Sequence, residues 1–213
     1  MPCPHKFRDQ LDLAQLDYEP ETLIVGTFNP AWPAENTARW FYGRTHDAQG
    51  HRSNNFWEVL PQVYDEGSLI DSVPVEWKAF CRRHRIAITD LIAGIADADE
   101  ENPEHVNWLS GYSDQQLAAH FNKHEFVDIG AILQRYPTIQ HIYLTRGAWG
   151  FWRQRWAPVL AVALREGKYA RTLLTPSDWA RIQHRLYNRQ NPGQTIAKLP
   201  DFILMRWKQV WHF

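Results

Sequence analysis

The run Thr22-Leu-Ile-Val-Gly-Thr-Phe28 decides how this chain folds. Its apolar residues are almost continuous and do not alternate with polar ones, which is the pattern of a strand covered by helices on both faces. Three further runs have the same character, 86–92 (IAITDLI), 141–146 (HIYLTR) and 171–175 (RTLLT). Segments with helical spacing separate these runs. The order predicts an α/β protein with a parallel sheet.

Two of the expected helices carry signals at their ends. Ser113-Asp-Gln-Gln resembles a capping sequence, and Gly167 follows a long periodic segment as a helix-terminating glycine does. The acidic stretch Asp97–Glu104 is expected to be a solvated loop. The chain has no repeat and no Gly/Ser linker, so residues 1–213 are expected to form a single domain. The expected helices are 54–64, 75–83, 113–123, 128–136, 148–165 and 201–210.

Composition excludes several classes of protein. The 213 residues are 44% apolar and 22% charged, close to globular averages and far from the composition of disordered chains. The longest apolar run, Trp156–Leu164, is much shorter than the roughly 20 residues that span a bilayer, and the first residues lack a signal sequence. Cys3 and Cys81 cannot supply four ligands to zinc or to an iron-sulfur cluster. We therefore expect a reduced, cytoplasmic protein with no membrane segment, no metal and no cofactor.

Charge is distributed unevenly along the chain. Residues 1–140 carry 11 Lys and Arg against 21 Asp and Glu, a net charge of −10, whereas residues 141–213 carry 12 against 3, a net charge of +9. A basic segment of this kind is typical of proteins that neutralise the phosphates of a nucleic acid. The two halves could equally neutralise each other within the fold, so charge alone leaves both interpretations open.

The segments that follow the predicted strands are the first place to look for a ligand site, because parallel sheets bind ligands at their carboxyl edge. Three of the four are loops that combine small residues with a polar group and an aromatic ring, and the fourth is a single polar residue. This mixture suits the stacking of a planar ring and hydrogen bonding to its edge, although any one such loop could simply turn the chain and fill the core. The segments are Gly26–Trp32, Asp90, Arg146–Gly150 and Thr175–Arg181.

Familiar catalytic motifs are missing, among them GxGxxG, GxxxxGK[ST], GxSxG and HExxH. His120 and His124 are spaced to share one helix face, where they could bind a metal or simply face solvent. Cys81 stands among basic residues that could lower its pKa, but an inert thiol is the more common case. Ser177 has no evident His or Asp partner, which argues against a serine hydrolase.

Three segments together provide the specific signal: Leu23-Ile-Val-Gly-Thr-Phe-Asn-Pro30, Trp40-Phe-Tyr-Gly-Arg44 and Asn54-Asn-Phe-Trp-Glu-Val-Leu60. They resemble the opening of the uracil-DNA glycosylase superfamily, nearest to the branch that acts on hypoxanthine or uracil. Ile88-Thr-Asp90 resembles the second strand of that family, and Leu174-Thr-Pro-Ser177 resembles its Pro-Ser loop. The resemblance extends over about residues 20–190.

This resemblance implies a three-layer α/β/α sandwich with a short, mostly parallel central sheet. It also implies monofunctional hydrolysis of the bond between a deaminated base and its deoxyribose. The partner would be DNA that contains a damaged base, bound by a monomer without a cofactor. Amides can hold the attacking water and stabilise charge on the departing base, so asparagines can carry the catalysis. The resemblance assigns catalysis to Asn54 and Asn29; the base pocket to Gly26, Thr27, Phe28, Tyr42 and Asp90; and DNA binding to Thr175, Pro176, Ser177, Trp179, Arg181 and Arg185.

Two departures from the family pattern keep an alternative open. Gly43 and Asn54 are further apart than in the family, by an insertion over residues 45–53, and Asn29 stands one position beyond the usual first-loop asparagine. The alternative is a non-catalytic module that binds a nucleobase or nucleic acid on the same fold. A third possibility, an unrelated α/β hydrolase, has no identifiable nucleophile.

Overall fold

A computed structural model describes residues 1–32, 36–47, 49–111 and 113–213. Its centre is a parallel sheet with the strand order β3-β2-β6-β7. All four strands lie within or overlap the apolar runs that predict them, and each ends earlier than predicted. The strands are β2 (Thr22–Gly26), β3 (Ile86–Asp90), β6 (His141–Leu144) and β7 (Tyr169–Thr172).

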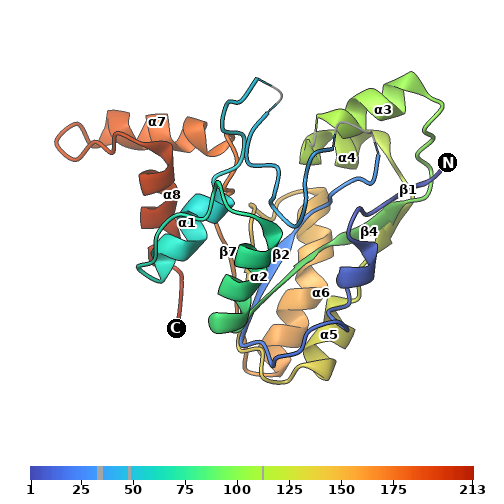
Figure 1. The fold of residues 1–213 in the computed structure, drawn as a ribbon, viewed down its shortest axis with the longest axis horizontal. Coiled ribbons are helices and arrows are strands. Elements are labelled where there is room, and N and C mark those ends of the chain that lie inside the picture. Colours follow the sequence, from blue (N-terminus) through green and yellow to red (C-terminus); the bar gives the residue numbers. More distant parts are fainter. Residues whose placement is uncertain (33–35, 48, 112) are drawn as a thin grey trace.

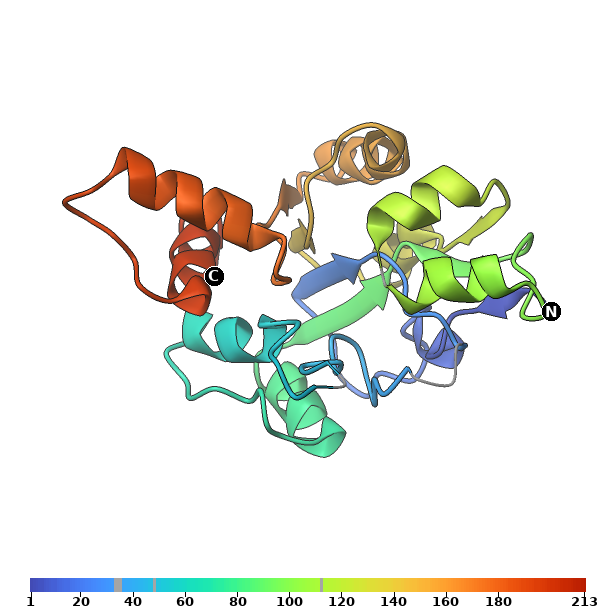
Figure 2. The same ribbon diagram turned by 90° about the horizontal axis from the view of Figure 1, so that it is seen from above.

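Helices cover both faces of this sheet, so the three-layer prediction is confirmed (Figures 1 and 2). Leu23 and Val25 of β2 pack into the core on one face, while Ile24 between them packs into the core on the other. Because successive side chains of a strand point to opposite faces, a strand buried on both faces must be continuously apolar. The helices are α5 (Ile129–Arg135) and α6 (Phe151–Arg165) on the first face, and α1 (Phe56–Val63), α2 (Pro74–Arg83) and α8 (Leu199–Lys208) on the second.

A small antiparallel sheet lies beside the main one and was not predicted from the sequence. It has the order β1-β4-β5, formed by Cys3–Pro4, Ile92–Ile95 and His124–Phe126. The prediction of one strand over residues 86–92 is therefore wrong, because the chain leaves the parallel sheet after Asp90. The amide of Leu91 still bonds to the carbonyl of Gly26, at 3.1 Å, and β4 then pairs with β1.

The predicted helix signals at Ser113 and Gly167 are confirmed. The Ser113 side chain accepts the amide of Gln116 at the start of α4 (Asp114–His120), and Gly167 follows α6 with φ +66°. Because α4 ends at His120 and His124 belongs to β5, the two histidines do not share a helix face. The His120 ring instead stacks on Trp108 with a centroid distance of 3.9 Å.

Two helices escaped prediction from the sequence. The first, α3 (Pro103–Ser110), begins inside the stretch expected to be a loop, although Asn102 caps it and proline occupies its first turn. The second, α7 (Ala180–Gln190), lies beside α8 at one side of the molecule (Figure 1). Its sequence is too polar to show a core-facing stripe. No helix within the described ranges is long and apolar enough to cross a membrane.

The two cysteines are buried and free, which contradicts the idea of a reactive Cys81. Burial raises the pKa of the Cys3 thiol to about 11 and that of Cys81 further still. Since the thiolate is the reactive form, we expect neither cysteine to react with a thiol reagent at pH 8 in the native protein. Both should react once urea unfolds the chain, which a chromogenic disulfide reagent can count; fast labelling without urea would contradict the burial.

Candidate functional site: a cleft at the carboxyl edge of the sheet

A cleft of about 860 Å³ opens where the four parallel strands end, within the size range of ligand pockets. Segments that follow β2, β6 and β7 line it, together with the last residue of β3 and the first residues of α4 and α6. Segments far apart in the sequence thus meet at one edge. The sequence-predicted residues that line this cleft are Thr27, Phe28, Asn29, Tyr42, Asn54, Asp90, Thr175, Pro176, Ser177 and Trp179.

Gly26 lies directly behind the floor of the cleft. A Cβ atom at this position would lie 2.0 Å from Oδ1 of Asp90 and 2.7 Å from the hydroxyl of Tyr42. Glycine is therefore required here by the close approach of two polar groups. Tyr42 has a positive φ of 55° and is held by stacking on Phe56 at 3.8 Å and by a 2.8 Å hydrogen bond to Thr145. Burial raises the pKa of the Tyr42 phenol well above its usual value, so the group is a neutral hydroxyl.

The carboxylate of Asp90 is oriented by a residue from the N-terminus. His5 is 2% exposed and its Nε2 lies 2.7 Å from Oδ2 of Asp90. Nδ1 of the same ring accepts the backbone amide of Phe7 at 2.9 Å, so this nitrogen carries no proton and Nε2 donates to the carboxylate. This arrangement leaves Oδ1 of Asp90 above Gly26.

Asn54 presents the NH₂ end of its side chain. Its Oδ1 accepts the amide of Phe56 at 2.8 Å, and a backbone amide can only donate, so Nδ2 must point away from the first turn of α1. The additional residues before it form a closed loop, in which His46 pairs with Arg52 and the Ser53 amide bonds to Thr45 at 2.9 Å. Ala48 of this loop lies outside the described residues. The insertion thus returns the chain to the cleft at Asn54.

Asn36 orients the side chain of Asn29, whose oxygen is engaged as that of Asn54 is. The amide of Ala38 bonds to Oδ1 of Asn36 at 3.0 Å, which directs Nδ2 of Asn36 to Oδ1 of Asn29 at 2.7 Å. The Nδ2 group of Asn29 is consequently the end that remains for a ligand. Both candidate asparagines therefore line one cleft as potential donors, each with its oxygen already engaged.

The Thr175-Pro-Ser177 loop is attached to the start of α1. Asn55, which is buried, donates both its backbone amide and its Nδ2 to the carbonyl of Pro176, at 2.8 and 3.1 Å. Asn54 and Ser177 form an isolated antiparallel bridge, and the hydroxyls of Thr175 and Ser177 lie 2.9 Å apart. The second asparagine of the Asn-Asn-Phe-Trp segment is thus structural, whereas the first faces the cleft.

An ion pair that the sequence did not reveal forms part of the wall, between the buried Arg146 and the partly exposed Asp114. Asp114 accepts the hydroxyl of Thr27 at 2.6 Å and pairs with Arg146 at 2.5 Å. The guanidinium of Arg146 lies 4.1 Å from the ring centroid of Trp152, within the range of a cation–π contact. Burial raises the pKa of Asp114 and lowers that of Arg146, so desolvation outweighs their mutual attraction for both groups.

Three predicted residues do not line the cleft. Gly26 lies beneath its floor, as described above. Arg181 and Arg185 lie on the exposed face of α7, where Arg181 pairs with Asp178 at 3.0 Å. The same helix exposes Ile182 and Leu186 to solvent, and Trp179 precedes it. The rim of the cleft therefore continues into a surface that is both basic and apolar.

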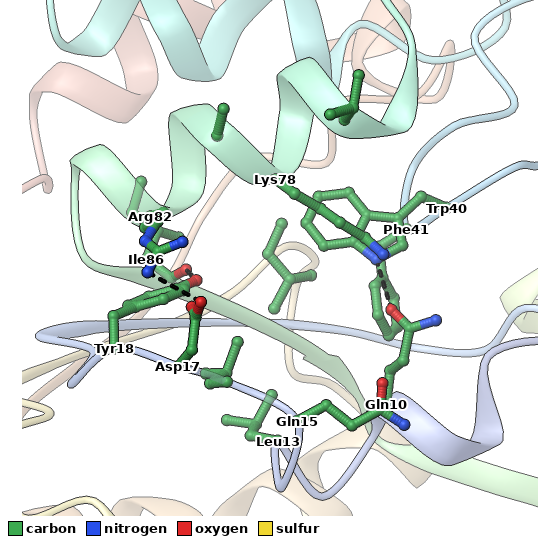
Figure 3. A pocket seen from close by; sticks show the side chains of 14 residues that line it. Gln10, Leu13, Gln15, Asp17, Tyr18, Trp40, Phe41, Lys78, Arg82 and Ile86 are labelled. Carbon is green, nitrogen blue, oxygen red and sulfur yellow. Dashed lines mark hydrogen bonds and ion pairs between the residues drawn. The ribbon is translucent and has the colours of Figure 1, made fainter.

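A smaller cavity of about 410 Å³ lies between α2, the first half of β3 and residues 10–18 (Figure 3). Two pairs of its polar groups bond to each other, Arg82 to Asp17 at 2.8 Å and Trp40 to Gln10 at 2.8 Å. It contains none of the predicted site residues. We therefore assign the functional site to the larger cleft.

Over the described ranges of the chain, no group of three or more His, Cys, Asp or Glu side chains is placed to hold a metal ion.

The sequence matches no protein-family model and no curated protein. A similar solved structure is the solution NMR structure of a protein described as a putative uracil DNA glycosylase from Methanosarcina acetivorans, with 17% identity and a TM-score of 0.52. The similarity covers 92% of this chain and 94% of that chain, and it shows that the two proteins share a fold.

Proposed function

We propose that this protein is a DNA glycosylase of the uracil-DNA glycosylase superfamily that removes a deaminated base, uracil or hypoxanthine, from DNA. The observation that carries the proposal is the placement of Asn29 and Asn54 in one cleft, each with its side-chain oxygen engaged by a neighbour and its NH₂ group at the other end of the amide. The shared fold with a structure described as a putative uracil DNA glycosylase supports it.

The reaction follows from these donors. The bond between the anomeric carbon and the nucleobase breaks, and its electron pair leaves on the nucleobase. A water oxygen then bonds to the carbon, and the water loses a proton to the departing nucleobase or to solvent. Donors aimed at the departing base stabilise the charge that develops there. Among the described residues that line the cleft there is no lysine, the amine that a second, strand-cleaving step through a Schiff base would use. The proposal is therefore a monofunctional glycosylase.

DNA would approach along α7 and the Thr175-Pro-Ser177 loop. The inner face of α7 is occupied, because His184 and Asn188 both bond to the carbonyl of Ile196. Its outer face exposes arginines that can contact phosphates and apolar side chains that can occupy the gap left by an extruded base. The cleft lies at one end of this surface.

The proposal is tested by incubating the protein with labelled oligonucleotides that contain uracil, hypoxanthine or xanthine, in single and double strands, followed by alkali. Strand breakage at one lesion, and only after alkali, is the expected result. An absence of breakage at every lesion would refute the enzymatic proposal.

The alternative of a non-catalytic binding module has one observation in its favour, since both asparagine oxygens already serve structural hydrogen bonds. Tight binding without breakage would support that module.

The contribution of α7 to DNA binding can be measured by its salt dependence. We expect Arg185→Ala to weaken binding of duplex DNA and to reduce the slope of log K against log salt by about 0.9 for one lost phosphate contact. Arg165→Ala is the matched control, because Arg165 is an exposed arginine at the opposite end of α6 from the cleft. Both slopes are measured by fluorescence anisotropy titrations. If the slope of log K against log salt is the same for the two variants, Arg185 does not contact DNA and α7 is not part of the DNA-binding surface.

A further inference from the structure

We infer that Asp90 selects the base, and that it favours a base whose ring N–H lies beside a C–H or N–H group over one whose ring N–H lies between two carbonyl groups. Hypoxanthine has the favoured edge, whereas uracil and xanthine have the disfavoured one. The inference rests on the proposed function, because it defines the substrate class of the same cleft.

The first step of the argument is that the Asp90 carboxylate cannot turn. It is 6% exposed, and its Oδ2 is held by Nε2 of His5 at 2.7 Å. The His5 ring is itself enclosed by the rings of Phe7, Phe28 and Phe41, with centroid distances of 5.9, 5.7 and 5.7 Å. Oδ1 therefore has a fixed place above Gly26 at the floor of the cleft.

The second step concerns what this oxygen can bind. A carboxylate oxygen accepts hydrogen bonds and cannot donate them, so it attracts an N–H group and repels a carbonyl oxygen. Repulsion between two such oxygens is weakly screened at a site this little exposed to solvent, because the effective dielectric constant is lower there than in bulk water. The N1–H of hypoxanthine has C2–H on one side, whereas the N1–H of xanthine and the N3–H of uracil have a carbonyl on each side. Xanthine differs from hypoxanthine by one carbonyl oxygen at C2, so a variant that changes the hydrogen-bonding group without changing its shape is needed to separate this effect from fit.

The third step is the substitution Asp90→Asn, in which His5 determines the orientation of the new side-chain amide. In Asp90→Asn, the Nε2–H group of His5 can bond only to the amide oxygen, since Nδ1 is engaged with the amide of Phe7. The new NH₂ group must then replace Oδ1 at the floor of the cleft. The substitution thus turns an acceptor into a donor at one fixed point, with almost no change of shape. A donor favours carbonyl edges, so the order of preference should reverse.

The experiment measures binding and cleavage separately. Quenching of tryptophan fluorescence on titration with 2′-deoxyinosine, 2′-deoxyxanthosine and 2′-deoxyuridine reports binding, because Trp149 and Trp152 line the cleft. The buffer is chosen so that xanthine remains neutral. We expect the unmodified protein to bind deoxyinosine about 10- to 100-fold more tightly than deoxyxanthosine, and Asp90→Asn to reverse this order. Single-turnover cleavage of oligonucleotides with the same three bases should follow the same ranking.

The outcomes distinguish this inference from the proposed function. The expected nucleoside ranking without cleavage of any oligonucleotide would refute the glycosylase and leave Asp90 as the base-selecting residue. Cleavage with uracil or xanthine preferred by the unmodified protein would keep the glycosylase and overturn the inference. An equal loss of cleavage on every base in Asp90→Asn, with unchanged ranking, would also overturn it and make Asp90 a catalytic group. A preference of the unmodified protein for xanthine or uracil in nucleoside binding needs no variant and would overturn the inference even if Asp90→Asn fails to fold. Failure to bind or cleave any of the three would refute both.

Discussion

Replacing Asn54 by alanine is expected to slow base release about 100- to 1000-fold under single-turnover conditions, the usual cost of removing one donor that stabilises developing charge. The reason is the orientation of the side chain, whose oxygen is bonded to the amide of Phe56 and whose NH₂ group is left for the cleft. The measurement is the rate of alkali-sensitive strand breakage with enzyme in excess over a damaged oligonucleotide.

The same substitution removes the hydrogen bond that the Phe56 amide donates to Asn54 just before α1, which costs about 1 kcal/mol of stability and must be separated from the catalytic effect. Asn54→Ser is the matched control, because a serine oxygen can accept the Phe56 amide in the same kind of turn and serine lacks the NH₂ group. We expect Asn54→Ser to regain the stability lost in Asn54→Ala and to remain slow. If Asn54→Ser restores both stability and rate, Asn54 serves only to accept the Phe56 amide and catalysis must be assigned elsewhere.

Replacing Trp57 by alanine is expected to lower the free energy of unfolding by about 3–5 kcal/mol, a large share of the roughly 5–15 kcal/mol that stabilises a typical domain. Trp57 is fully buried on the first turn of α1 and stacks on Trp77 with a centroid distance of 5.1 Å and an angle of 8°. Its indole N–H donates to the carbonyl of Phe41 at 3.0 Å, so alanine leaves both a cavity and an unpaired carbonyl. Urea unfolding followed by circular dichroism measures the loss.

The control for this prediction is another tryptophan. Trp149 is 65% exposed at the rim of the cleft, and Trp149→Ala should change stability by less than about 0.5 kcal/mol. Because both variants lose one indole, a difference between them reports burial and not residue type. A loss in Trp57→Ala as small as that in Trp149→Ala would contradict the packing of α1 against the sheet.

The layers of the fold could be read from the sequence because their signal is local. A strand buried on both faces must be apolar at nearly every position, and the runs at 22–28 and 141–146 show this without reference to any neighbour. Capping by Ser113 depends only on residues three positions apart and was equally readable. The polar helix α7 gave no such signal, because its apolar residues Ile182 and Leu186 face solvent and not the core.

The candidate site could likewise be predicted from local sequence only in part. The sequence by itself determined that small, polar and aromatic residues follow each parallel strand, and the geometry of such a sheet requires those strand ends to meet. Only the tertiary structure decided that His5 orients Asp90 across 85 positions of sequence and that Asp114 pairs with Arg146 and Thr27. It also decided which end of each asparagine faces the cleft, since the contacts of Phe56 and Asn36 set that orientation. A hydrogen bond between residues distant in the chain leaves no periodic pattern in the sequence, because it depends on where the fold places two side chains and not on how they are spaced.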